Sequence, residues 1–225
     1  MKKIVVLTGC SRGIGFAILQ SLLNSDNNLI IIGVGKRKPD LEEIGNFFFY
    51  EGDLSDLSQA QAICNQIIDT YGRVDWLINN AGAGVFKELE LISMAEWIRI
   101  MNLNLSTPFI FIKSFLPSMK QFNYGRIISI SSDADYKGFK EGGLYCASKF
   151  GLRGMVESVR EELVGLNISI SNISPGRVDT YFNNKKPGDR PISLFASDVA
   201  SQVMHILSQS ERCQIESIYL RSNLE

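Results

Sequence analysis

The sequence has little of what a metal site or a disulfide framework requires. It contains a single histidine and four cysteines, and the cysteines are far apart without the spacing of metal ligands. A zinc site needs several such ligands close together. We therefore expect no metal, and we expect reduced cysteines in the core or in helices. The cysteines are Cys10, Cys64, Cys146 and Cys213.

Net charge and long apolar runs are also scarce. The 23 lysines and arginines nearly balance the 24 acidic residues, so the net charge is −1 and gives no field for holding nucleic-acid phosphates. The apolar run Ile4–Leu7 is too short for the core of a signal peptide, and no stretch approaches the length of a membrane span. We therefore expect a cytoplasmic protein without nucleic-acid or membrane partners.

Short apolar runs alternate with longer helical periods along all 225 residues. Most of these runs are continuous rather than alternating, which is typical of parallel strands buried on both faces. Strands that alternate with helices imply right-handed crossovers. The sequence therefore predicts one α/β domain over residues 1–225, a doubly wound, mostly parallel seven-stranded sheet with helices on both faces. The expected strands are Ile4–Leu7, Leu29–Val34, Phe47–Tyr50, Trp76–Ile78, Arg126–Ile130, Ile168–Ile173 and Ile215–Leu220.

Three further segments have distinctive patterns. Apolar residues recur at helical spacing over residues 57–71 and end at Gly72, which predicts a helix that stops there. The stretch Leu105–Met119 is apolar nearly all round, so a helix there needs cover on both faces. The core or a subunit interface could supply that cover, and we favour the interface. The polar segment Asn183–Arg190 is the best candidate for a mobile loop.

A glycine-rich turn, Thr8–Gly15, follows the first strand and opens a helix. Glycines allow a tight turn and a close approach of the backbone to a pyrophosphate, and the free N–H groups of the helix then face the anion. The spacing Gly-x3-Gly-x-Gly differs from the usual dinucleotide fingerprint, so a purely structural turn is the alternative to phosphate binding. The candidate binding residues are Gly9, Ser11, Arg12, Gly13, Ile14 and Gly15.

The same turn also matches the Gly-x-Ser-x-Gly nucleophile elbow, which offers a rival from another class. This rival is a serine hydrolase that uses Ser11, Asp198 and His205. The hydrolase fold places several strands and an oxyanion loop before its nucleophile, whereas one short strand precedes Ser11. His205 falls in an apparent amphipathic helix, where a solvated or capping histidine is expected. The hydrolase therefore ranks last among our alternatives.

The second predicted strand runs into the basic turn Lys36-Arg37-Lys38, and no carboxylate follows before Asp40. In dinucleotide folds an acidic residue at this place holds the ribose 2′-hydroxyl, whereas arginine or lysine accommodates a 2′-phosphate. Arg12 in the glycine turn adds a further cation. A solvated basic turn is the alternative. The pattern favours NADPH over NADH, with Lys36 and Arg37 as the 2′-phosphate contacts.

Tyr145 and Lys149 stand four residues apart at the start of a predicted helix, so they share one face of it. A free phenol titrates near pH ~10, and an adjacent ammonium group pulls its pKa toward the working range. The serine pair Ser131-Ser132 follows a predicted parallel strand, at the edge where active sites of such sheets gather. A serine there can donate a hydrogen bond to a substrate oxygen.

Taken in order, these residues make the chain similar to the short-chain dehydrogenase/reductase family, from Lys3 to about Leu220. Two spacings place the motifs: Ser132 lies 13 positions before Tyr145, and Asn104 lies 21 positions before Gly125. These steps favour Ser132 over Ser131 and Asn104 over Asn102. The matching motifs are Thr8–Gly15, Asp53-Leu54, Asn79-Asn80-Ala81-Gly82, Asn104, Ser132, Tyr145-x3-Lys149 and Pro175-Gly176-x3-Thr180.

The resemblance implies a Rossmann-like fold and a role for each matched position. The implied catalytic tetrad is Asn104, Ser132, Tyr145 and Lys149, with Tyr145 as proton donor, Ser132 on the substrate oxygen, and Asn104 holding a water that relays protons to Lys149. Tyr145 and Lys149 would also contact the coenzyme, and Lys149 would hold the nicotinamide ribose. Asp53 and Leu54 would line the adenine pocket, and Asn80, Ala81 and Gly82 would pass beside the adenosine ribose. Pro175, Gly176, Val178 and Thr180 would border the nicotinamide.

The resemblance also implies an activity and an assembly. We expect an NADPH-dependent oxidoreductase that transfers a hydride between the nicotinamide and a carbonyl or alcohol of a small molecule, with a substrate loop over residues 177–197. A catalytically silent NADPH sensor or scaffold of the same fold is the alternative. A homotetramer or homodimer would form through the helices over 105–119 and 145–163. Asn123 and Leu166 stand where carrier-protein reductases have basic residues, which disfavours a carrier-bound acyl substrate.

Overall fold

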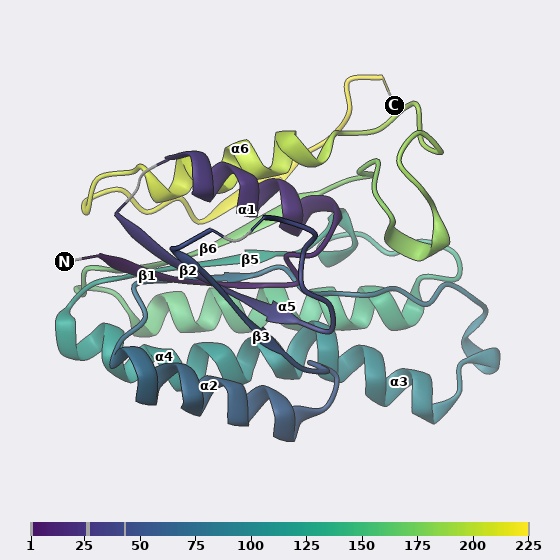
Figure 1. The fold of residues 1–225 in the computed structure, drawn as a ribbon. Coiled ribbons are helices and arrows are strands. Elements are labelled where there is room, and N and C mark those ends of the chain that lie inside the picture. Colours follow the sequence, from purple (N-terminus) through teal and green to yellow (C-terminus); the bar gives the residue numbers. More distant parts are fainter. Residues whose placement is uncertain (1, 26–27, 43, 225) are drawn as a thin grey trace.

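The computed structural model describes residues 2–25, 28–42 and 44–224. It has one seven-stranded sheet in the order β3-β2-β1-β4-β5-β6-β7, and every neighbouring pair of strands is parallel (Figure 1). The predicted fold class and all seven predicted strands are confirmed. The strands are β1 (Lys3–Thr8), β2 (Leu29–Gly35), β3 (Phe47–Glu51), β4 (Trp76–Asn79), β5 (Gly125–Ile130), β6 (Ile168–Pro175) and β7 (Ser217–Leu220).

Helices cover both faces of this sheet (Figure 1). Helices α1 and α6 pack on one face over a core that includes Ile18, Leu22 and Val203. Helices α2, α4 and α5 lie on the other face, over a core that includes Phe111 and Phe115. The helices are α1 (Gly13–Ser25), α2 (Leu57–Tyr71), α3 (Met94–Met101), α4 (Thr107–Phe122), α5 (Gly143–Glu162) and α6 (Ala196–Leu207).

Helix α2 shows how local signals fix the element boundaries. The Asp56 carboxylate caps its first turn by accepting from the N–H groups of Ser58 at 3.0 Å and Gln59 at 3.3 Å. Gly72 ends it with φ 72°, a left-handed conformation that glycine adopts without strain. The predicted end of the helix at Gly72 is confirmed.

The strongly apolar stretch before Met119 is divided between two structures. A π-helical turn, Asn102–Ser106, precedes α4, so the helix itself begins at Thr107 rather than at Leu105. Phe111 and Phe115 are fully buried and meet edge to face at 5.7 Å between ring centroids. The core of the same chain therefore covers most of this helix, while the Phe109 side chain stays 49% exposed.

The four cysteines are free in the structure. Cys10, Cys64 and Cys146 are buried, as expected, and burial raises the pKa of the Cys10 and Cys64 thiols to about 12. Cys213 is an exception, because it is partly exposed and lies in the connection after α6. Within residues 2–25, 28–42 and 44–224, no group of three or more metal-ligating side chains occurs. The helices of the same ranges include none that is long and apolar enough to cross a membrane.

The glycine turn makes a stability prediction. A Cβ at Gly15 would lie 2.1 Å from the Gly9 carbonyl oxygen and 2.4 Å from the Asn80 amide nitrogen, so Gly15→Ala must displace backbone. We expect its free energy of unfolding to fall by about 1–3 kcal/mol in urea denaturation. Gly154 in α5 is exposed with open space around it, so Gly154→Ala should instead gain about 0.5–1 kcal/mol. Equal stability of the two variants would contradict this assignment of the turn.

Candidate active site

The four residues of the expected tetrad come from three segments that meet at the carboxyl edge of the sheet. Ser132 lies two residues after the end of β5, and Tyr145 and Lys149 lie in the first turns of α5. Asn104 lies in the π-helical turn before α4. Helix α5 begins at Gly143, two residues earlier than predicted, so Tyr145 already lies inside the helix. The structure therefore brings all four side chains to one region.

The Tyr145 phenol is almost completely enclosed and lies beside Ser132. Its side chain is 8% exposed, and the Ser132 hydroxyl lies close enough to affect the pKa of the phenol. Burial raises the pKa of the phenol above its ordinary value, and Ser132 opposes that shift. The carboxylate of Asp133 adds to the rise. In this state of the protein, Tyr145 is therefore a protonated hydroxyl at neutral pH.

Lys149 is a buried cation, and none of the described carboxylates lies in ion-pair distance of it. Its side chain is buried, and its ammonium donates to the Ile130 carbonyl at 3.0 Å. The ammonium lies 5.9 Å from the centroid of the Tyr145 ring. Burial lowers the pKa of Lys149 to about 8, while the negative charge of Asp135 acts in the opposite direction. Lys149 is therefore a cation whose charge is easily lost near neutral pH.

Asn104 fixes the loop that follows β4. Its side-chain oxygen accepts from the Ala83 N–H at 3.0 Å, and its amide nitrogen donates to the Ala83 carbonyl at 2.9 Å and to Ser148 at 3.0 Å. A Cβ at Gly82 would lie 3.4 Å from the Asn104 oxygen and 3.8 Å from the Lys149 ammonium. The π-helical turn thus holds Asn104 between the loop that follows β4 and helix α5. Such turns are frequent at functional sites.

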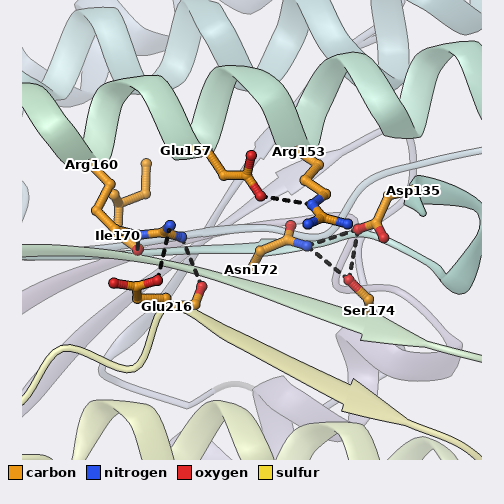
Figure 2. A network of polar contacts seen from close by, with 8 residues as sticks. All are labelled: Asp135, Arg153, Glu157, Arg160, Ile170, Asn172, Ser174 and Glu216. Atoms are coloured by element: carbon orange, nitrogen blue, oxygen red, sulfur yellow. Dashed lines mark hydrogen bonds and ion pairs between the residues drawn. The ribbon is translucent and has the colours of Figure 1, made fainter.

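A buried polar network lies beside these residues and was not predicted from the sequence (Figure 2). The Asp135 carboxylate, fully buried, accepts from the Asn172 amide at 2.8 Å and from the Ser174 hydroxyl at 2.6 Å. The other Asp135 oxygen is buried with no hydrogen-bond partner among the described residues. Asn172 and Ser174 are two of the four polar residues in the buried strand β6, and buried polar residues of this kind were the available signal. The network fixes a negative charge near Lys149.

The glycine turn has the shape that a dinucleotide requires. Gly9 and Gly13 adopt positive φ angles of 71° and 57°, and the turn ends at the N-terminus of α1. The Thr8 hydroxyl accepts from the N–H groups of Asn80 and Ala81, both at 3.0 Å. The Asn80 amide donates back to the carbonyls of Thr8 and Gly9. The turn therefore presents backbone N–H groups with no side chain at its glycines, which fits a pyrophosphate.

Two of the residues expected near the adenosine part of the coenzyme line an open hollow of about 550 Å³. Lys36 and Asp53 both line it, and they form an ion pair at 2.8 Å. Although partial burial of Asp53 acts against it, the hydrogen bond from Lys36 holds the pKa of this carboxyl below its usual range. Leu54 is buried and its carbonyl accepts from the Thr107 hydroxyl. Arg37 is exposed and has no ion-pair partner among the described residues.

The residues expected near the nicotinamide lie where β6 ends. Gly176, directly after Pro175, donates its N–H to the Leu220 carbonyl at 2.8 Å, and Val178 pairs with Leu194 in an isolated parallel bridge. Thr180 lies beside the glycine turn, since a Cβ built at Gly13 would lie 3.3 Å from the Thr180 Cβ. The end of β6 and the glycine turn thus face one another.

The segment after Thr180 packs against the glycine turn, and the Arg190 side chain holds its backbone in place. The Arg190 guanidinium donates to the carbonyls of Val178 at 3.0 Å, Thr180 at 3.4 Å and Phe182 at 2.9 Å. The Arg12 guanidinium lies 5.7 Å from the centroid of the Tyr181 ring. The predicted mobility of Asn183–Arg190 stays a prediction, and the backbone contacts of Arg190 act against it.

Aromatic rings around Tyr145 form a second feature that was not predicted. The rings of Phe86 and Phe182 lie 5.3 Å and 5.7 Å from the Tyr145 ring, between centroids. Phe139 packs on Phe86 at 5.8 Å. These rings come from three loops that are distant in sequence, so no spacing pattern points to them. The Tyr145 ring is therefore packed against apolar aromatic side chains.

The residues of the rival serine hydrolase are not connected to one another. The Asp198 carboxylate accepts from the Phe195 N–H in the first turn of α6. His205 is exposed on the same helix, and its ring has only Gln209 as a partner in the described part of the chain. Ser11 lies in the turn after β1, the first strand of the chain. The arrangement gives no nucleophile and base in contact.

Comparison with known proteins gives a consistent picture. A sequence model of the family "short chain dehydrogenase" matches residues 3–191. Sepiapterin reductase from Chlorobaculum tepidum is 31% identical, over 98% of this chain and 96% of that protein. D-beta-hydroxybutyrate dehydrogenase from Rhizobium meliloti is 30% identical, over 91% of this chain and 83% of that protein.

A solved structure resembles the whole chain. The alcohol dehydrogenase of the archaeon Thermococcus sibiricus, complexed with 5-hydroxy-NADP, has a TM-score of 0.88 at 27% identity and covers 100% of this chain and 98% of that one. Because the family match spans well over half of the sequence and the relatives align along nearly all of it, the chain belongs to the short-chain dehydrogenase family and is an NAD(P)-dependent oxidoreductase.

Proposed function

We propose that this protein uses NADPH to reduce the carbonyl group of a small molecule, or oxidises the corresponding alcohol, with Asn104, Ser132, Tyr145 and Lys149 as its catalytic tetrad. One observation carries the proposal: the buried Tyr145 hydroxyl meets Ser132, while the Lys149 ammonium lies close by on the same helix. A proton donor, an oxygen-binding hydroxyl and a cation are the groups that carbonyl reduction needs from a protein.

The chemistry divides simply between coenzyme and chain. When bound, NADPH supplies the hydride that forms the new C–H bond at the carbonyl carbon. Ser132 donates a hydrogen bond to the carbonyl oxygen, and Tyr145 gives its proton to that oxygen. Lys149 stabilises the phenolate left behind, and a water held by Asn104 relays a proton toward Lys149. Because burial raises the Tyr145 pKa, the proton to be donated is already in place at neutral pH.

The coenzyme contacts that we propose lie along the carboxyl edge of the sheet. Gly9, Ser11, Arg12, Gly13, Ile14 and Gly15 would hold the pyrophosphate, and Asn80, Ala81 and Gly82 would pass beside the adenosine ribose. Asp53 and Leu54 would line the adenine pocket. Pro175, Gly176, Val178 and Thr180 would border the nicotinamide, whose ribose would meet Tyr145 and Lys149. Arg37 and Lys36 would take the 2′-phosphate, with Arg37 as the stronger contact because Lys36 is shared with Asp53.

Two properties of similar proteins support this preference for NADPH. The Thermococcus sibiricus enzyme is complexed with 5-hydroxy-NADP, and a metagenomic short-chain oxidoreductase that is 29% identical, with a TM-score of 0.82, is in complex with NADP. The substrate loop would be residues 177–197, with Phe182 and Phe86 against the substrate. Since one relative at 31% identity is named a sepiapterin reductase, pteridines belong in the first substrate screen beside aldehydes, ketones and quinones.

Exposed apolar residues support a homodimer or homotetramer. Phe109 on α4 and Phe150 on α5 are 49% and 47% exposed, on the two helices through which we expect subunits to meet. Large exposed apolar side chains that lie on adjacent helices are typical of interaction surfaces. We place the assembled protein in the cytoplasm.

The first prediction concerns the proton donor. Tyr145→Phe removes the hydroxyl and should lower kcat by about 10²–10⁴-fold, because positioned proton transfer contributes this much. NADPH binding, followed by nucleotide fluorescence, should survive. Tyr71→Phe, a loss of the same group on α2, serves as the control and should keep full turnover. Turnover retained in Tyr145→Phe would refute the role of this residue. Tight NADPH binding by the native protein with no turnover in the whole screen would favour the silent sensor.

The second prediction separates NADPH from NADH. Arg37→Gln should raise the Kd for NADPH about 10-fold or more and leave that for NADH nearly unchanged, since a hydrogen bond to a charged group is worth ~1.5–3 kcal/mol. Adding Lys36→Gln should weaken NADPH further. Lys120→Gln, at the end of α4, removes the same charge elsewhere and should have no effect. A parallel loss of affinity for both coenzymes would contradict a 2′-phosphate site.

The third prediction concerns pH. The Lys149 ammonium is present below its pKa of about 8, so reduction should slow as pH rises through that value. Asp135→Asn removes a nearby negative charge, which lowers the pKa of Lys149 and also that of Tyr145. The alkaline fall of kcat/KM should therefore move to lower pH. Ser174→Ala removes a partner of Asp135 but no charge, and should leave the fall in place. A shift to higher pH in Asp135→Asn would refute this coupling.

A further inference from the structure

The end of the sheet opposite the active site, where the strands begin, contains a partly open cavity of about 220 Å³. Its walls are the first residues of β5 and β6, the segment after α5 and the segment after α6. Three arginines line it, namely Arg126, Arg160 and Arg212, together with the exposed carboxylate side chain of Glu211. Arginine thus predominates among the charged side chains of a small cavity that the proposed reaction does not use.

Arg126 is the unusual member of this set. It is 3% exposed, and its guanidinium donates one hydrogen bond, from Nη1 to the Gly125 carbonyl at 3.1 Å. It also lies over the Tyr124 ring, 5.4 Å from the centroid. Among the residues that the structure describes, no carboxylate lies within ion-pair distance of it. Because a guanidinium stays charged in proteins and a buried charge without a counter-charge is costly, Arg126 is suited to an anionic partner that these residues do not supply.

Arg160 shows how the same chain normally satisfies an arginine (Figure 2). Its guanidinium donates to the Ile170 carbonyl at 3.3 Å and to the Glu216 carbonyl at 2.8 Å, and it lies 3.7 Å from the Glu216 carboxylate. Arg160 therefore has its counter-charge, although it is more exposed than Arg126. Of these two arginines, Arg126 is therefore the one without a counter-charge among the described residues.

We propose that this cavity binds a small oxyanion, a phosphoryl or carboxylate group of a metabolite, through the guanidinium of Arg126. Guanidinium groups pair with such groups by two parallel hydrogen bonds, and Arg126 has unused donors for both. Arg212 lies on the outer wall and adds a second cation. The volume suits a small anion, since pockets for drug-sized ligands measure roughly 300–1,000 Å³. The site is separate from the proposed coenzyme and substrate sites and does not depend on them.

The test uses inorganic phosphate and succinate as probes. The protein is first saturated with its dinucleotide coenzyme, so that phosphate cannot enter that site, and ionic strength is kept constant with chloride. Titration calorimetry should show saturable binding of at least one probe. The stronger probe then tells whether a phosphoryl or a carboxylate group is preferred. No saturable binding of either would overturn the proposal.

Variants assign the site. Arg126→Met should weaken the binding at least 10-fold, and Arg212→Gln should weaken it by a smaller factor. Arg99→Gln, at an exposed arginine on α3, is the control and should leave phosphate and succinate binding unchanged. Binding that persists in Arg126→Met would place the anion elsewhere and overturn the proposal.

A measurement on the native protein covers the case in which Arg126→Met fails to fold. The Nε–H resonance of Arg126, assigned with Arg126→Lys, should shift in NMR spectra as phosphate or succinate is added and should saturate with the calorimetric affinity. A resonance that does not move while the anion binds would also overturn the proposal.

Discussion

The tie between the ends of β1 and β4 is the constraint on which the rest of the site depends. One hydroxyl, that of Thr8, accepts from two successive N–H groups, and the Asn80 amide returns two hydrogen bonds to the turn after β1. These strands are neighbours at the point where the strand order reverses, where the crossovers diverge to opposite faces. The tie therefore fixes the glycine turn against the loop that Asn104 holds from its other side. Without these hydrogen bonds, the glycine turn would no longer be held against the loop that Asn104 contacts.

Burial sets the chemistry of that edge. Enclosure makes the phenol of Tyr145 a weaker acid and the ammonium of Lys149 a stronger one, so the two pKa values move apart. The phenol therefore keeps its proton at neutral pH, whereas the ammonium loses its proton as the pH rises through about 8. The buried carboxylate of Asp135 limits how far the Lys149 pKa can fall, and hydrogen bonds from Asn172 and Ser174 keep that carboxylate in place. The fold thus sets the pKa values of Tyr145 and Lys149 through burial and through the fixed negative charge of Asp135.

The sequence predicts those parts of the molecule that depend on local pattern. Buried parallel strands are continuous apolar runs, and so all seven were found; only β7 starts later, at Ser217, because its ladder with β6 begins there. The four residues that we propose as the tetrad were selected by their fixed spacing, and the structure brings their side chains to one region. By contrast, the pair of Lys36 with Asp53, the rings around Tyr145 and the partners of Asp135 join residues that are distant in sequence. Such contacts leave no periodic pattern in the sequence. Their residues therefore cannot be distinguished from ordinary surface or core residues without the structure.

The two edges of the sheet can be compared through their buried cations. Lys149 and Arg126 are both enclosed, and each donates one hydrogen bond to a backbone carbonyl without a carboxylate in ion-pair distance among the described residues. A chain can bury a charge in this way only if other contacts offset the desolvation. For Lys149 the reason is the proposed reaction, because the charge acts on Tyr145 and the coenzyme. Arg126 has no reaction beside it, but it has a cavity. The same physical argument that makes Lys149 a working group therefore makes Arg126 a binding group, whose partner comes from solution.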